Sequence, residues 1–260
     1  MKAKKSFGQH FLNNEEISRD IAEGLATDLS TNRVLEVGPG KGMLTKYLIE
    51  LAFDLKVVEL DRDMIPILHS TFPVLEDKIL EVDFLKLDLE TVFDGKPFML
   101  IGNYPYNISS QIVFKMIDHR DLIPQMVGMF QKEVAKRIVA TPTSKAYGVI
   151  SVLTQAYYDG EYLFDVGNEN FDPPPKVQSG VIRLTRKSVD HAIPNPKLFK
   201  SIVKTAFSQR RKMLRNTMKA FLKGSEILED EFFTQRPERV SVEKFLWLTE
   251  VIYKHQNNGE

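Results

Sequence analysis

The first two-thirds of the sequence alternates short runs rich in β-branched residues with amphipathic stretches of helical length. This alternation is typical of a parallel sheet covered by helices, because each crossover between parallel strands needs a long connection. We therefore predict an α/β fold with seven strands. They are Val34–Val37, Val57–Leu60, Ile79–Val82, Phe98–Ile101, Met126–Phe130, Tyr162–Val166 and Val181–Leu184. The link between the last two contains Asp172-Pro173-Pro174-Pro175 and is too short for a helix, so we expect these strands to pair antiparallel at the sheet edge.

The pattern of the sequence changes in its last third. Ile193-Pro194-Asn195-Pro196 indicates a linker, because each proline blocks a helix and biases the preceding residue to an extended conformation. Beyond it no strand-like run remains, and apolar residues between Leu198 and Phe221 recur at helical spacing, with a break near Ser208. The chain is predicted to form two domains, an α/β domain of residues 1–190 and an all-helical domain of residues 191–260.

The composition excludes several classes of protein. Hydrophobic residues make up 43% of the 260 residues, which is enough for a sizeable core and excludes a disordered chain or a small stapled scaffold. The chain has no cysteine and its five histidines lie far apart, so we predict no metal site. The longest apolar runs are strand-sized, and no apolar stretch of a signal peptide follows the basic N-terminus. These features favour a cytoplasmic protein that binds no membrane.

A glycine-rich turn, Gly38-Pro39-Gly40-Lys41-Gly42, directly follows the first predicted strand. Such a turn lets the backbone approach a ligand closely and points helix N–H groups at an anionic group. Glu59 ends the next strand, 21 residues after Gly38, where an acid commonly binds a ribose diol. Because Met43 stands where the dinucleotide fingerprint has its last glycine, a nucleoside-bearing ligand without a pyrophosphate fits better than a nicotinamide cofactor. The alternative is a tight strand–helix turn with a surface glutamate.

Polar residues at the carboxyl ends of the next two strands suit the recognition of adenine. Asp83 could accept from an adenine amino group with Phe84 against the ring, although a helix N-cap is an equally good interpretation. Asn103-Tyr104-Pro105-Tyr106 offers an amide oxygen, a backbone carbonyl held by a proline and an aromatic ring. Two acceptors that grip an exocyclic amine beside a stacked base would localise the nitrogen lone pair, and no strong base is required. An Asn-X-Pro turn with a buried tyrosine is the alternative.

The charges balance overall but are segregated along the chain. Thirty-five basic residues match thirty-five acidic ones, yet residues 76–94 hold seven acids against two lysines, and residues 197–223 hold nine basic residues and no acid. This basic block indicates either a local polyanion-binding face or a solvated helix face. If the block binds RNA, the phosphate contacts are predicted at Lys200, Lys204, Arg210, Arg211, Lys212, Arg215 and Lys219. The spacing of Arg211, Arg215, Lys219 and Lys223 predicts a cationic stripe on one helix.

Eight short motifs follow one another along most of the chain. They are Lys5-Ser6-Phe7-Gly8-Gln9-His10-Phe11-Leu12, Gly38-Pro39-Gly40, Val58-Glu59-Leu60-Asp61, Asn103-Tyr104-Pro105-Tyr106-Asn107-Ile108-Ser109, Gln131-Lys132-Glu133, Ser144-Lys145-Ala146-Tyr147-Gly148, Phe171-Asp172-Pro173-Pro174-Pro175-Lys176-Val177 and Phe207-Ser208-Gln209-Arg210-Arg211-Lys212. In order and spacing, this series resembles the KsgA type of small-subunit ribosomal RNA adenine dimethyltransferase. The resemblance implies a Rossmann-like seven-strand S-adenosylmethionine-dependent methyltransferase domain with a small all-helical RNA-binding domain. It also implies N6,N6-dimethylation of two adjacent adenosines in the 3′-terminal hairpin of 16S rRNA, on an assembling 30S subunit, by a protein that we expect to be a monomer.

The resemblance also implies roles for individual residues. The cofactor contacts implied are His10, Leu12, Gly38, Gly40, Glu59, Asp83 and Asn103. The catalytic residues implied are Asn103, Tyr104 and Pro105, with the target base stacked between Tyr106 and Phe171. The family usually has asparagine where His10 stands and leucine where Tyr104 stands. The contact implied at Tyr104 is its backbone carbonyl, which any side chain preserves.

Two rival interpretations stay open. The large-subunit rRNA adenine methyltransferase that confers macrolide resistance shares the fold and a similar tetrapeptide, but the 207–212 and 173–175 segments favour the small-subunit type. A non-enzymatic nucleic-acid-binding relative, such as a mitochondrial transcription factor, would have no need of intact cofactor residues. The set Gly38, Glu59, Asp83 and Asn103 argues against it.

Overall fold

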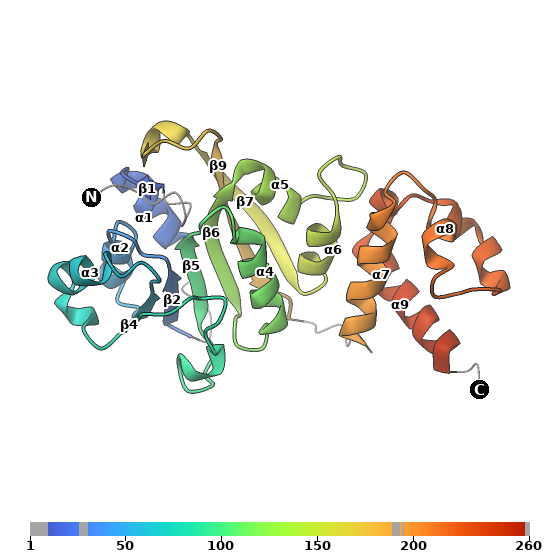
Figure 1. Ribbon diagram of the computed structural model, residues 1–260, viewed down its shortest axis with the longest axis horizontal. Helices are drawn as coiled ribbons and strands as arrows, with labels where there is room; N and C mark the ends of the chain where they lie inside the picture. The colour runs from blue at the N-terminus through green and yellow to red at the C-terminus, as the bar shows by residue number, and fades with distance from the viewer. Residues whose placement is uncertain (1–9, 26–30, 189–192, 194, 258–260) are drawn as a thin grey trace. The chain divides into compact units, whose positions relative to one another are not determined.

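The computed structural model describes residues 10–25, 31–188, 193 and 195–257 (Figure 1). The chain divides into two compact units. The first contains residues 1–136 and 159–186, and the second contains residues 137–158 and 187–260. The second unit therefore includes a segment, residues 137–158, that lies within the first domain predicted from the sequence.

The first unit is built on a seven-stranded sheet in the order β4-β3-β2-β5-β6-β9-β7, as the α/β prediction requires. Its strands are β2 (Arg33–Val37), β3 (Asp54–Val58), β4 (Ile79–Leu80), β5 (Met99–Asn103), β6 (Gln125–Gln131), β7 (Tyr158–Val166) and β9 (Ser179–Arg186). The pairs β3–β4, β2–β3, β2–β5 and β5–β6 are parallel, and β9 runs antiparallel to β6. The last two predicted strands are neighbours, with β7 at the sheet edge. Because β2 to β5 are parallel, their carboxyl ends meet at one edge.

Helices connect these strands (Figure 1). They are α1 (Glu15–Glu23), α2 (Thr45–Glu50), α3 (Ile65–Thr71), α4 (Ser109–Asp118) and α5 (Lys132–Ile138). The Asn14 side chain begins α1 by accepting from the backbone N–H of Ile17, and Ile21 and Ala22 form part of its buried face. In α4 the buried residues Ile112, Val113 and Met116 recur at helical spacing, which explains why this segment is a helix.

A second, two-stranded sheet was not predicted. The short strands β1 (Phe11–Leu12) and β8 (Phe171–Asp172) pair antiparallel, with Leu12 opposite Phe171. The backbone N–H of Asn13 extends the pairing by donating to the carbonyl of Asn170 at 2.9 Å. This ribbon joins the start of the chain to the proline-rich loop.

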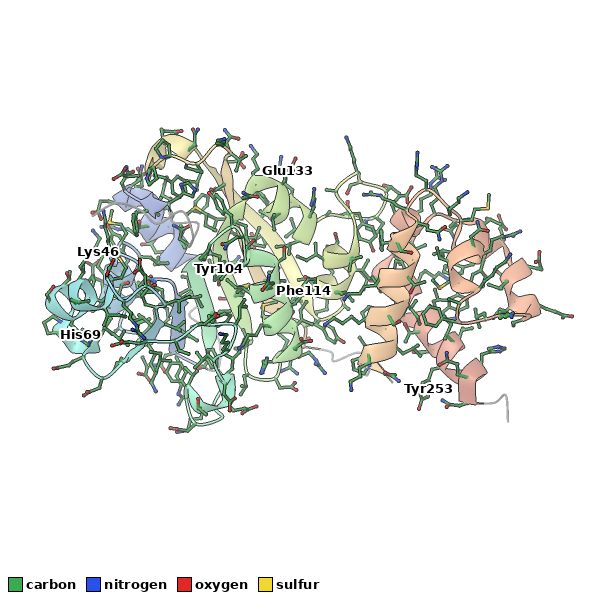
Figure 2. The ribbon with its side chains drawn as sticks, viewed as in Figure 1. Lys46, His69, Tyr104, Phe114, Glu133 and Tyr253 are labelled. Atoms are coloured by element: carbon green, nitrogen blue, oxygen red, sulfur yellow. The ribbon has the colours of Figure 1, made fainter. Side chains whose placement is uncertain are left out.

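The Tyr104 side chain lies buried against the sheet (Figure 2). Its hydroxyl donates to the carbonyl of Val127 at 3.2 Å, and its ring lies 5.0 Å from that of Phe130. The ring needs the space left by two glycines. A Cβ on Gly128 would lie 2.0 Å from the Tyr104 ring, and one on Gly102 would lie 2.9 Å from it.

We expect Gly128→Ala to lower the free energy of unfolding by about 3 kcal/mol, because the added methyl group and the Tyr104 ring would occupy the same space. Tyr104→Leu in the same chain removes the ring and reduces this cost. Chemical denaturation of the single and double mutants measures the coupling. Gly148→Ala is the control, because the nearest atom to an added Cβ there is 4.0 Å away. If Gly128→Ala lowers the free energy of unfolding equally in wild type and in Tyr104→Leu, the Tyr104 ring is not the group that the added methyl meets.

The second unit is helical. Its helices are α6 (Val149–Gln155), α7 (Pro196–Ser208), α8 (Leu214–Met218) and α9 (Val242–Asn257), with three short 3₁₀ turns, Glu226–Glu229, Glu231–Thr234 and Pro237–Arg239. Asn195 caps α7 by accepting from the backbone N–H of Leu198, and Pro196 occupies its first position. The predicted break near Ser208 is confirmed, because α7 ends there.

Residues 137–158 cluster with this unit through specific contacts. The backbone N–H of Thr143 donates to the carbonyl of Glu238 at 2.7 Å, and the Tyr147 hydroxyl donates to the carbonyl of Val240 at 2.9 Å. The Tyr147 ring also packs edge-on against Phe207 of α7, with centroids 6.1 Å apart. These contacts link segments far apart in sequence, so the local pattern could not predict them.

Candidate active site

A cavity of about 350 Å³ lies in the first unit at the carboxyl edge of β2 to β5. Every residue predicted to contact the cofactor lines it, as does the whole tetrapeptide that ends β5. These lining residues are His10, Leu12, Gly38, Gly40, Glu59, Asp83, Asn103, Tyr104, Pro105 and Tyr106. The rule that open α/β sheets bind ligands at the carboxyl ends of their strands therefore predicted the position of the cavity correctly.

The glycine turn forms one side of the cavity. Gly38 and Gly40 adopt φ values of 69° and 56°, in the left-handed region that favours glycine. A Cβ on Gly38 would meet nothing within 4 Å, so the backbone there borders open space rather than another side chain. The turn thus leaves room for a ligand directly against the main chain.

Glu59 joins this turn to the end of β3. One carboxylate oxygen accepts from the N–H of Gly40 at 3.1 Å and the other accepts from the N–H of Asp61 at 2.8 Å. The residue is only 7% exposed, so the alternative of a surface glutamate is wrong. Burial raises the pKa of Glu59. Each oxygen retains a lone pair, which suits a pair of ribose hydroxyls.

Asp83 combines features of both interpretations offered for it. One of its carboxylate oxygens accepts from the N–H of Leu85 at 2.9 Å and so caps a turn, although no described helix begins there. Asp83 and the buried ring of Phe84 also line the cavity. The Lys115 ammonium lies over the Phe84 ring, 5.3 Å from its centroid. A carboxylate beside an aromatic face is a suitable arrangement for an adenine ring.

Asn103, the last residue of β5, has a fixed amide orientation. Its Nδ2 donates to the backbone carbonyl of His10 at 3.0 Å. Because a carbonyl oxygen can only accept, the amide nitrogen must face His10, which leaves Oδ1 as the acceptor for another group. The start of the chain therefore determines which end of the Asn103 amide is available at the cavity.

The two predicted faces for the target base have different surroundings. Tyr106 lines the cavity, and its hydroxyl is 2.6 Å from the Oγ of Ser179. Burial raises the pKa of this tyrosine. Phe171 is 3% exposed, packs in the core opposite Leu12, and is absent from the cavity lining. The Tyr106 ring stacks with that of His10, with centroids 5.6 Å apart.

Glu36 is a lining residue that the sequence analysis missed. It is 1% exposed in β2, and its carboxylate accepts from the Thr45 hydroxyl at 2.7 Å. Burial raises the pKa of Glu36 to about 8. The signal that could have revealed it is a carboxyl group inside an otherwise apolar strand, because such a group is costly to bury.

We expect Glu36 to make stability depend on pH. Its pKa is higher in the folded chain than in the unfolded one, so its contribution is fully present at acidic pH and is lost as the pH rises to about 8. A difference of this size corresponds to at most on the order of 5 kcal/mol. Denaturation should show wild type losing stability relative to Glu36→Gln between pH 5 and about 8, whereas exposed Glu50→Gln should track wild type. Parallel pH profiles for wild type and Glu36→Gln would contradict this.

Within the described residues, the structure contains neither a candidate metal site nor a candidate membrane span. No group of three or more histidine, aspartate or glutamate side chains there is arranged to hold a metal ion. None of the helices in the same part of the chain is long and apolar enough to cross a membrane.

The sheet order and the position of the cavity are those of a Rossmann-like fold, and the matching family and relatives assign the protein to the S-adenosylmethionine-dependent methyltransferases. The open backbone at Gly38, the buried carboxylate of Glu59 and the Asp83–Phe84 pair fit the nucleoside part of that cofactor. Within this class, the chain belongs to the ribosomal RNA adenine dimethylase family, whose model matches residues 1–254.

Similar proteins agree with this assignment. The chain is 54% identical over 252 residues to ribosomal RNA small subunit methyltransferase A of Bacteroides fragilis, a match that covers 96% of this chain and 92% of the relative. It is 51% identical to the protein of the same name from Flavobacterium johnsoniae, covering 97% and 96% of the two chains. Among solved structures, it shares its fold with a dimethyladenosine transferase from Plasmodium falciparum (TM-score 0.80, 23% identity, 96% and 98% covered). It also shares its fold with the 23S rRNA methyltransferase ErmE (TM-score 0.66, 22% identity, 92% and 99% covered).

Proposed function

We propose that the protein dimethylates N6 of two adjacent adenosines in the 3′-terminal hairpin of small-subunit rRNA, acting as a cytoplasmic monomer on an assembling subunit. The observation that carries the proposal is the fixed amide of Asn103. With Nδ2 bound to the His10 carbonyl, Oδ1 is the acceptor at the cavity edge, where an exocyclic amine can donate to it. The relatives named for small-subunit methylation favour this substrate over large-subunit rRNA.

The cofactor supplies an electrophilic methyl group on a sulfonium. In our proposal Glu59 binds the ribose hydroxyls through charge-assisted hydrogen bonds, and Asp83 with Phe84 holds the adenine. Gly38 allows the main chain to approach the ligand closely, whereas the space beside Gly40 is taken by the Phe11 ring, so Gly40 contributes through its left-handed backbone conformation. His10 and Leu12, which line the same cavity, are the remaining proposed contacts from the start of the chain.

Asn103 Oδ1 and the backbone carbonyl of Tyr104 act on the target amine. Adenine N6 is a poor nucleophile because its lone pair is delocalised into the ring. Two acceptors that hold its N–H groups favour a more tetrahedral nitrogen and so localise that pair. Pro105 restricts the backbone at Tyr104, and burial of the Tyr104 side chain anchors it from the other side. On gaining the methyl group N6 would become cationic and would release one proton to water, so these residues raise reactivity by position rather than by removing that proton themselves.

The target base must leave its stack to reach such a site. Tyr106 provides an aromatic face at the cavity, and its contact with Ser179 restrains the ring. Base–aromatic stacking contributes about 1–3 kcal/mol per base, which offsets part of the cost of unstacking. Phe171, the second predicted face for the base, lies buried opposite Leu12 in the β1–β8 ribbon, and its stacking role stays a prediction.

The basic block is our proposed RNA-binding surface, but its members differ. The predicted stripe on one helix is wrong, because residues 209–213 are not helical and α8 contains only Arg215 of the stripe. Arg210 donates to the carbonyls of Ser144 and Lys145, at 3.4 and 2.8 Å, so it holds that loop. Arg215 lies 3.9 Å from Glu229. Five of the predicted phosphate contacts are exposed, namely Lys204, Arg210, Arg211, Lys212 and Lys219, whereas Lys200 and Arg215 are partly buried.

We expect Arg211→Ala to lower the slope of log K against log salt for rRNA binding by about 0.7–0.9, because one phosphate contact is lost. Arg215→Ala should lower it less, since Glu229 already offsets part of that charge. Filter binding over a salt series measures both slopes. Lys254→Ala, an exposed lysine of α9 outside the basic block, is the control. An unchanged slope in Arg211→Ala would show that the block is only a solvated surface.

The function is tested by incubating the purified protein with labelled S-adenosylmethionine and unmethylated small subunits, then mapping the modified nucleotides. The expected product is dimethyladenosine at two adjacent positions of the 3′-terminal hairpin. Transfer to large-subunit rRNA instead would favour the macrolide-resistance type. Loss of labelled-cofactor retention on a filter would favour the non-enzymatic alternative. Sedimentation of the same preparation tests whether the protein is a monomer in solution.

A further inference from the structure

A lysine of α4 holds the turn that follows β4. The Lys115 ammonium donates to the carbonyls of Leu85 and Leu87, at 3.1 and 2.5 Å. The same ammonium lies over the Phe84 ring, 5.3 Å from its centroid. Lys115 is 30 and 28 residues away from the two carbonyls in sequence, so one side chain attaches this turn to a distant element.

Lys115 can restrain the turn because α4 is itself anchored in the first unit. Five of the ten residues of α4 are buried, so the lysine projects from a fixed support. Lys115 is partly buried, and burial lowers its pKa, whereas the nearby carboxylates of Asp83 and Asp88 act in the opposite direction. A partly desolvated cation is thus held between carbonyl oxygens and the electron-rich face of a ring.

The turn held by Lys115 presents the groups that bind adenine in the proposed function. Asp83, Phe84 and Leu85 line the cavity, whereas Lys115 does not. One Asp83 oxygen accepts from the Leu85 N–H at 2.9 Å, so the orientation of the carboxylate depends on where the Leu85 backbone lies. Lys115 binds the carbonyl of that same leucine. A change at the lysine therefore reaches Asp83 through one residue and reaches the Phe84 ring directly.

We propose that Lys115 is a positioning residue for cofactor recognition, which holds the turn of residues 83–87 so that the Asp83 carboxylate meets the adenine amino group and Phe84 lies against the adenine ring. This inference rests on the proposed roles of Asp83 and Phe84, and adds a residue that acts through them. A lysine that only stabilises the fold would affect all ligands of the cavity alike. A lysine that orients an acceptor for one amino group affects most strongly the ligands that carry this group.

The test compares two nucleoside ligands that have no methyl group to transfer. S-adenosylhomocysteine carries the adenine amino group, whereas S-inosylhomocysteine has a carbonyl oxygen in its place. Calorimetry with the full-length protein gives the Kd of each ligand, and the ratio of the two Kd values measures recognition of the amino group.

The variants separate the ammonium from the rest of the side chain. Lys115→Met removes the charge and the donors and keeps the length of the side chain, whereas Lys115→Arg retains both charge and donors. Lys86→Met is the matched control, because Lys86 is an exposed lysine of the same turn. Thermal unfolding shows whether each variant is folded. If Lys115→Met does not fold, Lys115→Gln, which keeps a donor without the charge, takes its place.

We expect wild type to bind the adenosyl ligand at least about tenfold more tightly than the inosyl ligand. Lys115→Met should raise the Kd of S-adenosylhomocysteine by about tenfold and that of S-inosylhomocysteine by about threefold or less. Its kcat at saturating cofactor should stay within about twofold of wild type, because the loss is in binding. Lys115→Arg and Lys86→Met should keep most of the wild-type ratio.

The inference is overturned if the ratio of Kd values is unchanged in the folded Lys115→Met or Lys115→Gln variant. It is also overturned if Lys86→Met lowers the ratio equally, if Lys115→Arg is as impaired as Lys115→Met, or if wild type shows no preference for the adenosyl ligand. A wild type that methylates no rRNA would contradict the proposed function. The ratio is measured without RNA, so it still decides the inference in that case.

Discussion

Asn103→Ala is expected to lower the turnover number by roughly 10²–10³-fold while leaving the cofactor Kd within a fewfold of wild type. Loss of one contact that forms mainly in the transition state has an effect of this size in other enzymes. Oδ1 is the group concerned, because Nδ2 is already bound to the His10 carbonyl. Single-turnover methyl transfer at saturating cofactor and subunits measures the rate of the chemical step.

Asn103→Asp provides a sharper control. It keeps an acceptor oxygen at the cavity but places the other oxygen where Nδ2 now donates to the carbonyl of His10 at 3.0 Å. Two acceptors cannot share a hydrogen bond, so the side chain should lose its fixed orientation. We expect turnover between those of wild type and Asn103→Ala. Turnover of Asn103→Ala near that of wild type would exclude the proposed role in methyl transfer.

Glu59→Ala is expected to raise the cofactor Kd by roughly ten- to a hundredfold and to leave RNA binding unchanged. Hydrogen bonds from a ribose diol to a carboxylate contribute about 1.5–3 kcal/mol, which corresponds to that range. Calorimetry with the cofactor alone and filter binding with rRNA measure the two affinities. An unchanged cofactor Kd would show that Glu59 does not bind the cofactor.

The control for Glu59 must separate binding from the shape of the glycine turn. The carboxylate also accepts from the N–H groups of Gly40 and Asp61, so alanine loosens the turn as well. Glu59→Gln keeps one acceptor oxygen and removes the charge, so its Kd should lie between those of wild type and Glu59→Ala. Thermal unfolding of the cofactor-free variants shows how much of the effect comes from stability.

The sequence alone determined the parallel sheet and the position of its cavity. Strand periodicity placed Gly38, Glu59, Asp83 and Asn103 at the carboxyl ends of successive strands, and parallel strands bring such ends to one edge. This inference needs only local patterns and one general rule of chain geometry. The eight ordered motifs added the family, which the match over residues 1–254 confirms.

Only the tertiary structure decided how the site is closed. Pairing of β1 with β8 buries Phe171, and contacts across the same ribbon place His10 on Tyr106 and Pro173. Arg210 likewise binds the carbonyls of Ser144 and Lys145, and the predicted stripe of Arg211, Arg215 and Lys219 is broken by the non-helical residues 209–213. Each of these arrangements joins segments far apart in the chain through two-residue strands, a ring stack or one or two hydrogen bonds. Such contacts leave no periodic signal in either segment, because their free energy depends on a partner that the local sequence does not contain.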